Sequence, residues 1–217
     1  MTPLLMRISV ITVCYNAAST LEDAVQSVLS QTTDPREPFE LEYIVVDGRS
    51  TDGTLDLLEP YRSRISKLIS EPDQGLYDAM NKGIRAATGD VVAILNADDV
   101  YASLDILARV AAAFRETDAE AIYGNLNYVT AEDITQVKRH WRAGDFQPGA
   151  FRRGWMPPHP ALFVRRSCYE RWGMFSLALR SAADYELMLR FIHRHGMSLA
   201  YPVSYTHLRA HETERNR

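Results

Sequence analysis

Short apolar stretches and stretches with helical spacing follow one another along most of this chain. Most of the apolar stretches are rich in β-branched residues, as buried parallel strands are, and they cover Arg7–Tyr15, Leu41–Val46, Lys67–Ser70, Val91–Leu95 and Ala121–Tyr123. Apolar residues recur at helical spacing after four of them, near residues 21–29, 55–61, 77–87 and 104–114. Strands that alternate with helices imply an α/β fold with a mostly parallel sheet and right-handed crossovers.

The pattern changes in the last part of the chain. Between Trp141 and Trp172 the periodicity breaks down amid Gly, Pro and aromatic residues, as expected of a region that covers a substrate. Helical spacing returns from Asp184 to His195. After Pro202 the sequence is polar and has no apolar face that could complete a core, so we expect residues 203–217 to be a non-native or disordered tail.

Polar residues gather where three of the expected strands end, at Tyr15-Asn16, at Asp47 and at Asn96-Ala-Asp-Asp99. Ligands of parallel α/β sheets bind beyond the carboxyl ends of the strands, so this cluster predicts a binding site. Asp98 and Asp99 could supply the carboxylate oxygens that a divalent cation takes beside a substrate phosphate. They could equally form an acidic turn or a helix cap.

Four other positions, Gly75, Asn81, Asp184 and His159, could belong to the same site. Backbone N–H groups near Gly75, at the start of a predicted helix, suit an anion, and Asn81 would face inward one turn later. Asp184 opens the last predicted helix, where it could cap the helix or act as a general base, and its position alone favours the cap. His159 lies between two prolines, where a lone histidine is more often structural or solvated than functional.

Composition narrows the classes of function. A net charge of −4 provides no general attraction for nucleic acid, so we expect no nucleic-acid partner. Cys14 and Cys168 form no disulfide framework, which fits a reducing cytoplasm. No apolar stretch approaches the roughly 20 residues that cross a bilayer. We therefore expect a cytoplasmic protein, which could still lie on the inner face of a cell membrane.

Four segments of the chain, taken in order, resemble the family 2 glycosyltransferases, whose fold is called GT-A. They are Ser9–Asn16, Asp47–Thr54, Ser70–Gly83 and Gly89–Asp99, and the third (SEPDQGLYDAMNKG) looks like polysaccharide and O-antigen sugar transferases. The resemblance runs from about Arg7 to Pro202. It implies one GT-A domain at residues 1–202, with a Rossmann-like nucleotide-sugar-binding half at about 1–125 and an acceptor-side half at about 126–202.

The resemblance also implies roles for the matched residues. The base and ribose would be held by Thr12, Tyr15 and Asp47, and the nucleotide pocket completed by Asp73, Gly75 and Asn81. Asp98, with Asn96 beside it, would bind Mg²⁺ or Mn²⁺ that bridges the diphosphate of the donor. Asp184 matches the position of the catalytic base, which favours that role over the cap. His159 falls in the acceptor-side loop, where it could contact the diphosphate or the acceptor.

Two positions depart from the family pattern. Asn96 stands where the metal motif usually begins with Asp, and Ala183 stands where Glu often precedes the base. The implied reaction is an inverting transfer of a sugar from a nucleotide-diphosphate donor, UDP by family habit, to a hydroxyl of a glycan or lipid-linked acceptor in cell-surface polysaccharide synthesis. The alternative is a nucleotide-sugar-binding protein that is inactive in transfer. A dinucleotide-dependent oxidoreductase is disfavoured, because no Gly-rich fingerprint follows the first strand.

Overall fold

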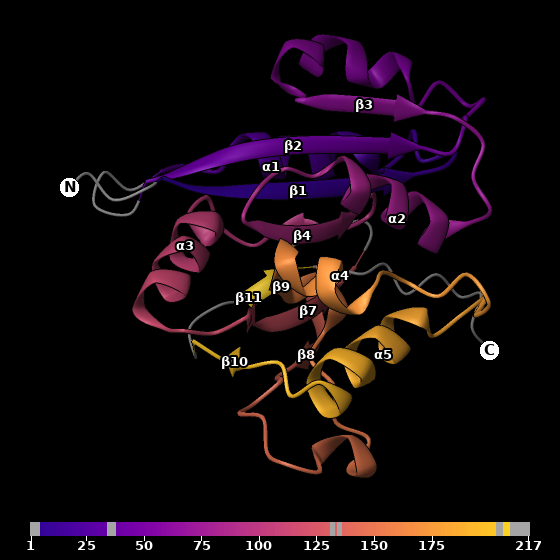
Figure 1. Cartoon of the computed structure of the whole chain (residues 1–217). Coiled ribbons are helices and arrows are strands. Elements are labelled where there is room, and N and C mark those ends of the chain that lie inside the picture. Colours follow the sequence, from indigo (N-terminus) through magenta and orange to yellow (C-terminus); the bar gives the residue numbers. More distant parts are fainter. Residues whose placement is uncertain (1–4, 34–37, 131–132, 134–135, 203–205, 209–217) are drawn as a thin grey trace.

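The centre of the protein is a sheet of seven strands (Figure 1). The structure is a computed structural model, and it describes residues 5–33, 38–130, 133, 136–202 and 206–208. The strands of this sheet are β1 (Met6–Cys14), β2 (Phe39–Asp47), β3 (Lys67–Ser70), β4 (Val91–Asn96), β6 (Ala121–Tyr123), β9 (Leu162–Arg165) and β10 (Leu199–Ala200). Their order is β10-β6-β9-β4-β1-β2-β3. Strand β9 runs antiparallel to β4 and β6 while the other pairs are parallel, which confirms the predicted mostly parallel sheet.

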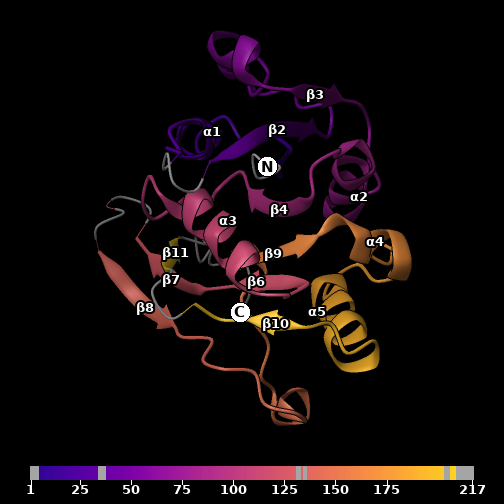
Figure 2. The same cartoon turned by 60° about the vertical axis from the view of Figure 1, so that its left-hand side comes forward.

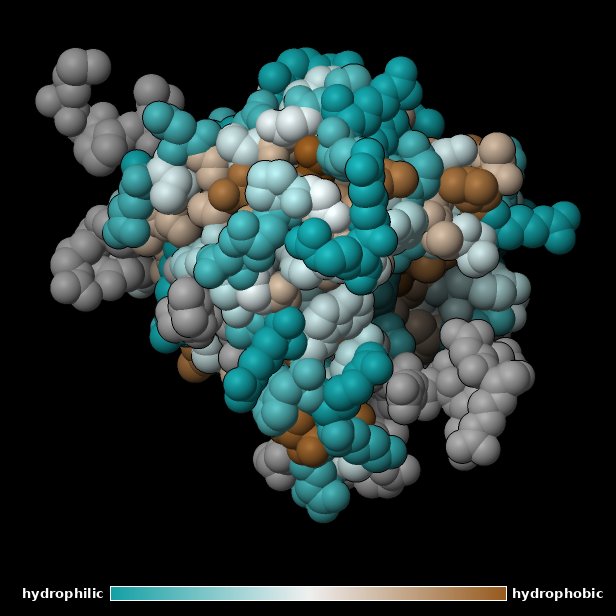
Figure 3. All heavy atoms as spheres, turned by 90° about the horizontal axis from the view of Figure 1, so that it is seen from below, coloured by the Kyte–Doolittle hydropathy of each residue, from teal (hydrophilic) through white to brown (hydrophobic). Residues whose placement is uncertain are grey.

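Helices cover both faces of the sheet. They are α1 (Leu21–Leu29), α2 (Leu76–Ala86), α3 (Ile106–Glu116), α4 (Arg166–Trp172) and α5 (Ala183–Met188), with the 3₁₀ helices η1 (Asp56–Arg64), η2 (Ala150–Arg153) and η3 (His159–Ala161) and the π-helical turn η4 (Leu189–Arg194). Figure 2 shows α1 and α3 on one side of the sheet and α2, α4 and α5 on the other. On the face seen in Figure 3, hydrophilic residues cover most of the surface and hydrophobic residues show in small patches.

Strand β1 contributes to two separate hydrophobic cores, because successive side chains of a strand point to opposite faces. Ile8 and Val10 belong to the core under α1 and α3. Ile11 and Val13 belong to the core under α2 and α5. Burial on both faces explains why the strand was recognisable as a continuous apolar run.

A second, smaller sheet was not predicted. It consists of β5 (Val100–Tyr101), β7 (Asn125–Val129), β8 (Val137–Trp141) and β11 (Thr206–Leu208), in the order β5-β11-β7-β8. Strand β11 falls in the stretch expected to be a non-native or disordered tail, and it pairs with β5 and β7. Residues 203–205 and 209–217 lie outside the described residues. The expectation for the tail as a whole therefore stays a prediction.

Two helical predictions changed in kind. The stretch near residues 55–61 forms the 3₁₀ helix η1 with Pro60 inside it, and proline cannot donate the hydrogen bond that an α-helix needs there. The helix expected from Asp184 to His195 is α5 followed by the π-helical turn η4. In the described part of the chain, no helix combines the length and apolar character that crossing a membrane requires.

Candidate functional site

Two loops leave the sheet together at the carboxyl ends of β1 and β2, because Cys14 lies opposite Asp47 in the parallel register. They are joined by hydrogen bonds. The Asn16 N–H donates to Ser50 Oγ at 2.8 Å, and the Thr51 N–H donates to Asn16 Oδ1 at 2.9 Å. Asn16 has a left-handed backbone with φ of 49°. The two strand ends that the sequence singled out therefore form one connected wall.

Asp47 holds the second of these loops in shape. Its carboxylate is 0% exposed and accepts hydrogen bonds from the Arg49 N–H at 3.0 Å, from the N–H and hydroxyl of Ser50, and from the Ser70 hydroxyl at 2.6 Å. Protein donors surround the carboxylate, and the expected contact of Asp47 with a base or ribose stays a prediction. Burial and then the Asp47 charge raise the pKa of Cys14 to about 12, so this thiol stays protonated.

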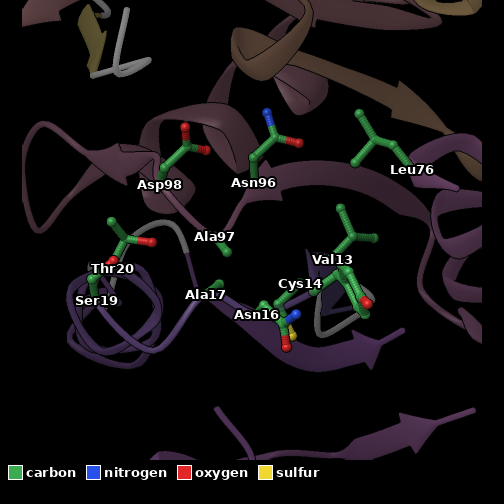
Figure 4. Close-up of a pocket in the computed structure, with 11 residues that line it drawn as sticks. Val13, Cys14, Asn16, Ala17, Ser19, Thr20, Leu76, Asn96, Ala97 and Asp98 are labelled. Carbon is green, nitrogen blue, oxygen red and sulfur yellow. The ribbon is translucent and has the colours of Figure 1, made fainter. Parts of the chain in front are cut away.

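A cavity of about 660 Å³ opens beside this wall (Figure 4). It is lined by Val13, Cys14, Tyr15, Asn16, Ala17, Ser19, Thr20, Leu76, Asn96, Ala97 and Asp98. These residues come from the carboxyl ends of β1 and β4 and from the starts of α1 and α2, so three of the predicted residues, Tyr15, Asn96 and Asp98, meet as expected. Tyr15 is 66% exposed and Leu76 52%, and exposed flat or apolar side chains on a cavity wall suit the ring of a ligand.

Asp73 and Gly75 lie next to this cavity. The Gly75 N–H donates to Asp73 Oδ1 at 2.8 Å, in a turn where Gly75 has φ of 109°. A Cβ atom on Gly48 would lie 2.6 Å from Asp73 Oδ2 and 3.2 Å from the Tyr15 ring, so these three residues are close neighbours. The absence of a side chain at Gly48 keeps Asp73 beside Tyr15.

Two residues expected to contact the nucleotide are buried and hydrogen-bonded to other protein groups, and their nucleotide contacts stay predictions. Thr12 is 0% exposed, and its hydroxyl accepts a hydrogen bond from the Tyr43 hydroxyl at 3.0 Å. Asn81 is 2% exposed, and its amide is occupied by the backbone of Phe175. Both side chains are packed inside the protein in this structure.

The donor atoms near Asp98 fit a divalent cation that a substrate phosphate helps to hold. Asp98 is a half-buried carboxylate on the cavity wall. Figure 4 shows Asp98 and Asn96 next to each other on this wall. Within the residues that the structure describes, Asn96 Oδ1 is buried and has no hydrogen-bond partner. The same residues contain no cluster of three or more His, Cys, Asp or Glu suited to a metal. A cation would therefore need oxygens from its substrate, as Mg²⁺ commonly does.

Asp184 lies beside the first turn of α2. It is half-buried, and its Oδ1 accepts a hydrogen bond from the Tyr77 hydroxyl at 3.1 Å. The cap of α5 is Ala182, with φ of 64°, so Asp184 does not serve as the cap. A left-handed non-glycine residue is strained, and such strain gathers at functional sites. Asp184 is not among the described residues that line the cavity, but its partner Tyr77 directly follows Leu76, which is.

His159 is a neighbour of Asp184. It is 9% exposed, and its ring packs edge-on against Phe175 at 5.5 Å. Burial lowers the pKa of His159, although the charge of Asp184 acts in the opposite direction. The imidazole is therefore neutral near pH 7, so one ring nitrogen can donate a hydrogen bond and the other can accept one.

The comparison with known sequences identifies the family of the chain. The profile of Glycosyl transferase family 2 matches residues 9–200, which include every site residue discussed above. The chain belongs to glycosyltransferase family 2. The resemblance seen in the sequence is thereby confirmed, and the sheet with its flanking helices is the GT-A fold.

Individual relatives and solved structures are similar to the chain as well. The chain is 32% identical over 189 residues to a PGL/p-HBAD biosynthesis glycosyltransferase of Mycobacterium bovis BCG, which covers 84% of the chain and 68% of the relative. S. aureus TarS 1–349 in complex with UDP has a TM-score of 0.69 at 19% identity, over 93% of the chain. The mannosyltransferase PcManGT of Pyrobaculum calidifontis, in complex with GDP-Man and Mn²⁺, has a TM-score of 0.70 at 21% identity, over 99% of the chain. The chain spans 59% of the length of each of these two structures.

Two residues near the site of this family 2 protein were not assigned to it from the sequence. The first is Tyr77, whose hydroxyl contacts Asp184. The second is Lys82, whose ammonium bonds the Pro72 carbonyl at 2.6 Å and the Glu71 carboxylate at 3.0 Å and so holds the segment leading to Asp73. Helical spacing places both on α2 but carries no information on partners from other segments.

Proposed function

We propose that this family 2 member is an inverting glycosyltransferase that moves a sugar from a nucleotide-diphosphate donor to an acceptor hydroxyl. The observation that carries the proposal is the cavity at the carboxyl ends of β1 and β4, with Asp98 on its wall and Asp184 beside the helix that lines it. A binding protein without transfer activity would need Asp98 to hold the donor but would have no use for Asp184.

The donor would bind in the cavity with its base against Tyr15 and its diphosphate near Asp98. The exposed ring of Tyr15 suits stacking on the base of a nucleoside, and the exposed side chain of Leu76 suits apolar contact with it. Asp98 would hold Mg²⁺ or Mn²⁺, and Asn96 Oδ1 offers a neutral oxygen nearby. The cation, when bound, would stabilise negative charge on the departing diphosphate. Structures of GT-A neighbours with UDP and with GDP-Man and Mn²⁺ support a donor of this class, and we take UDP as its nucleotide.

Asp184 would act as the general base. The acceptor oxygen attacks the anomeric carbon as the bond from that carbon to the diphosphate oxygen breaks, and the configuration inverts. The hydroxyl proton passes to Asp184, and the nucleoside diphosphate leaves with the bonding electrons. Since Tyr77 occupies Asp184 Oδ1, the other carboxylate oxygen is available for this proton. His159 would contact the diphosphate or the acceptor from the acceptor-side half.

The acceptor would be a glycan or a lipid-linked molecule in cell-surface polysaccharide synthesis, which the chain could meet as a cytoplasmic protein at the inner face of the membrane. This part of the proposal comes from the segment Ser70–Gly83. The mycobacterial relative named for PGL/p-HBAD biosynthesis supports a role in making glycosylated cell-envelope products.

Calorimetric titration tests the donor site. UDP, GDP and dTDP are titrated into the wild type and into Asp98→Ala, each with and without Mn²⁺. We expect one nucleotide to bind in a Mn²⁺-dependent manner and to lose that dependence in Asp98→Ala. A folded wild type that binds none of the three would contradict the proposal. Binding without release of nucleoside diphosphate from any UDP-sugar would favour the inactive binding protein.

A further inference from the structure

Tyr77 connects the helix beside the cavity to the carboxylate of Asp184. It is the second residue of α2, directly after Leu76, and its hydroxyl donates to Asp184 Oδ1 at 3.1 Å over 107 residues of sequence. Within the described ranges, no other side chain donates a hydrogen bond to the Asp184 carboxylate. The orientation of this carboxylate therefore depends on one phenol group.

The phenol group of Tyr77 is itself fixed. Its ring stacks on Phe175, with ring centroids 5.6 Å apart and planes inclined by 20°. Phe175 is 4% exposed, and its backbone makes two hydrogen bonds of 2.9 Å each with the Asn81 side chain, one turn further along α2. The ring therefore rests on a segment that α2 holds in place, so Tyr77 has little freedom to rotate.

The same arrangement brings His159 to the carboxylate. Phe175 stacks with Tyr77 and packs nearly perpendicular to the His159 ring, with ring centroids 5.6 Å and 5.5 Å apart. Burial and then the charge of Asp184 raise the pKa of Tyr77, so its hydroxyl is protonated at neutral pH and can donate to Asp184. A protonated phenol on Oδ1 leaves Oδ2 as the oxygen that can accept a proton.

We propose that Tyr77 is the positioning residue of Asp184, and that Asn81 and Phe175 serve this arrangement rather than the nucleotide. The inference rests on the proposed function, because it assigns Tyr77 to the base of the transfer reaction. Tyr77 touches no reacting atom and acts through Asp184 alone. Its hydroxyl selects one orientation of the carboxylate, so that the free oxygen faces the acceptor at the moment of transfer.

A ligand-free measurement tests the positioning directly. The side-chain carboxyl carbon of Asp184 is observed by ¹³C NMR at pH 7 and assigned by its absence in Asp184→Asn. Tyr77→Phe keeps the ring and its stacking and removes the hydroxyl, so we expect it to move the Asp184 resonance. The matched control is Tyr61→Phe, which removes another tyrosine hydroxyl bonded to a carboxylate, that of Glu22 at 2.9 Å. It should leave the Asp184 resonance in place.

A kinetic measurement tests the role in transfer, followed as release of UDP from a UDP-sugar that the wild type uses. We expect Tyr77→Phe to lower kcat by about tenfold, since small misplacements of reacting groups cost such factors. The affinity for UDP and the KM for the donor should not change. The acid limb of the pH–rate profile should move to higher pH, because the charged carboxylate loses a donor. A loss of stability alone would not lower kcat and shift the pH profile while the affinity for UDP and the KM stay unchanged.

The two hypotheses fail in different ways. A wild type that binds no nucleotide would end the proposed function and would leave the NMR result valid. An Asp184 resonance at its wild-type position in Tyr77→Phe would overturn the positioning role, whatever the wild type binds. A normal kcat and pH profile in a Tyr77→Phe enzyme whose wild type is active would overturn it as well.

Discussion

Asn81 and Phe175 exchange two hydrogen bonds although 94 residues separate them in the sequence. The amide nitrogen of Asn81 donates to the Phe175 carbonyl at 2.9 Å, and its Oδ1 accepts the Phe175 N–H at 2.9 Å. Both polar atoms of the Asn81 side chain thus bond the backbone of Phe175, in the way that a residue of a neighbouring β-strand would. This pair ties the segment before α5, and through it Asp184, to the helix beside the cavity.

Replacement of Asn81 by Ala should destabilise the protein by about 2–3 kcal/mol, because it leaves a buried peptide N–H and C=O without partners. The free energy of unfolding is measured by urea titration. Asn127→Ala is the matched control, since Asn127 bonds His140 at 2.7 Å on the exposed surface. That variant should lose less than about 0.5 kcal/mol. Equal losses in the two variants would contradict the importance of the Asn81 pair.

The sequence predicted the parts of the site that follow from parallel strands. Tyr15, Asn96 and Asp98 meet because β1 and β4 are neighbours in register, so their carboxyl ends reach the same edge. It did not predict what Asn81 contacts. Helical spacing predicted that Asn81 faces inward, and it does. Its partner, however, is the backbone of Phe175, which lies on a segment with no periodic pattern. The roles of Thr12 and Asp47 were carried over by resemblance, and their burial depends on Tyr43, Ser50 and Ser70, which no local pattern ties to them.

Gly48→Ala should weaken nucleotide binding at least tenfold while the fold is kept. The backbone of Gly48 is fixed by its N–H bond to the Cys14 carbonyl at 2.9 Å, so an added Cβ atom must displace Asp73 or the Tyr15 ring. Both lie at the expected nucleotide end of the cavity. The affinity is measured by calorimetry with UDP and Mn²⁺, and a thermal melt of the same sample checks the fold. Wild-type affinity in a folded Gly48→Ala would show that the nucleotide binds elsewhere.

Glu42 should make stability depend on pH in the acid range. Its carboxylate is 1% exposed. Burial alone would raise its pKa, but hydrogen bonds from Ser9 at 2.6 Å and from Thr88, together with the Lys67 charge, outweigh burial and lower the pKa from 4.5 to about 2. A folded pKa below the unfolded one stabilises the protein above pH 4.5, and this contribution is lost as the pH falls towards 2.

Glu42→Gln should therefore cost about 3 kcal/mol of unfolding free energy at pH 7. The difference from the wild type should shrink as urea titrations are repeated at pH 4 and pH 3, because the wild-type carboxyl is then progressively protonated too. Glu40→Gln is the control, since Glu40 is on the surface and pairs with Arg7 at 3.5 Å. It should change stability by less than about 1 kcal/mol at every pH. A Glu42 effect that does not vary with pH would contradict the linkage.

Asp184→Asn should abolish transfer and spare donor binding. The amide keeps the size of the side chain and can still accept the Tyr77 hydrogen bond at its oxygen, but it cannot take a proton from an acceptor hydroxyl. We expect kcat to fall by about 100-fold or more, the usual range for a lost general base. The affinity for UDP should stay within twofold of the wild type. The measurement is UDP release under saturating donor, beside calorimetry on the same preparation.

Glu186→Gln provides the comparison that separates base chemistry from a general loss of carboxylate in α5. Glu186 lies on the same helix, two residues further on, and pairs with Arg190 at 2.8 Å. Its loss should leave kcat near the wild-type value, because its charge is already engaged by arginine. If Asp184→Asn and Glu186→Gln reduced kcat alike, the effect would come from the helix as a whole. If Asp184→Asn kept full turnover, the proton would have to leave by another group, and His159, the neutral imidazole beside Asp184, would be the next residue to replace.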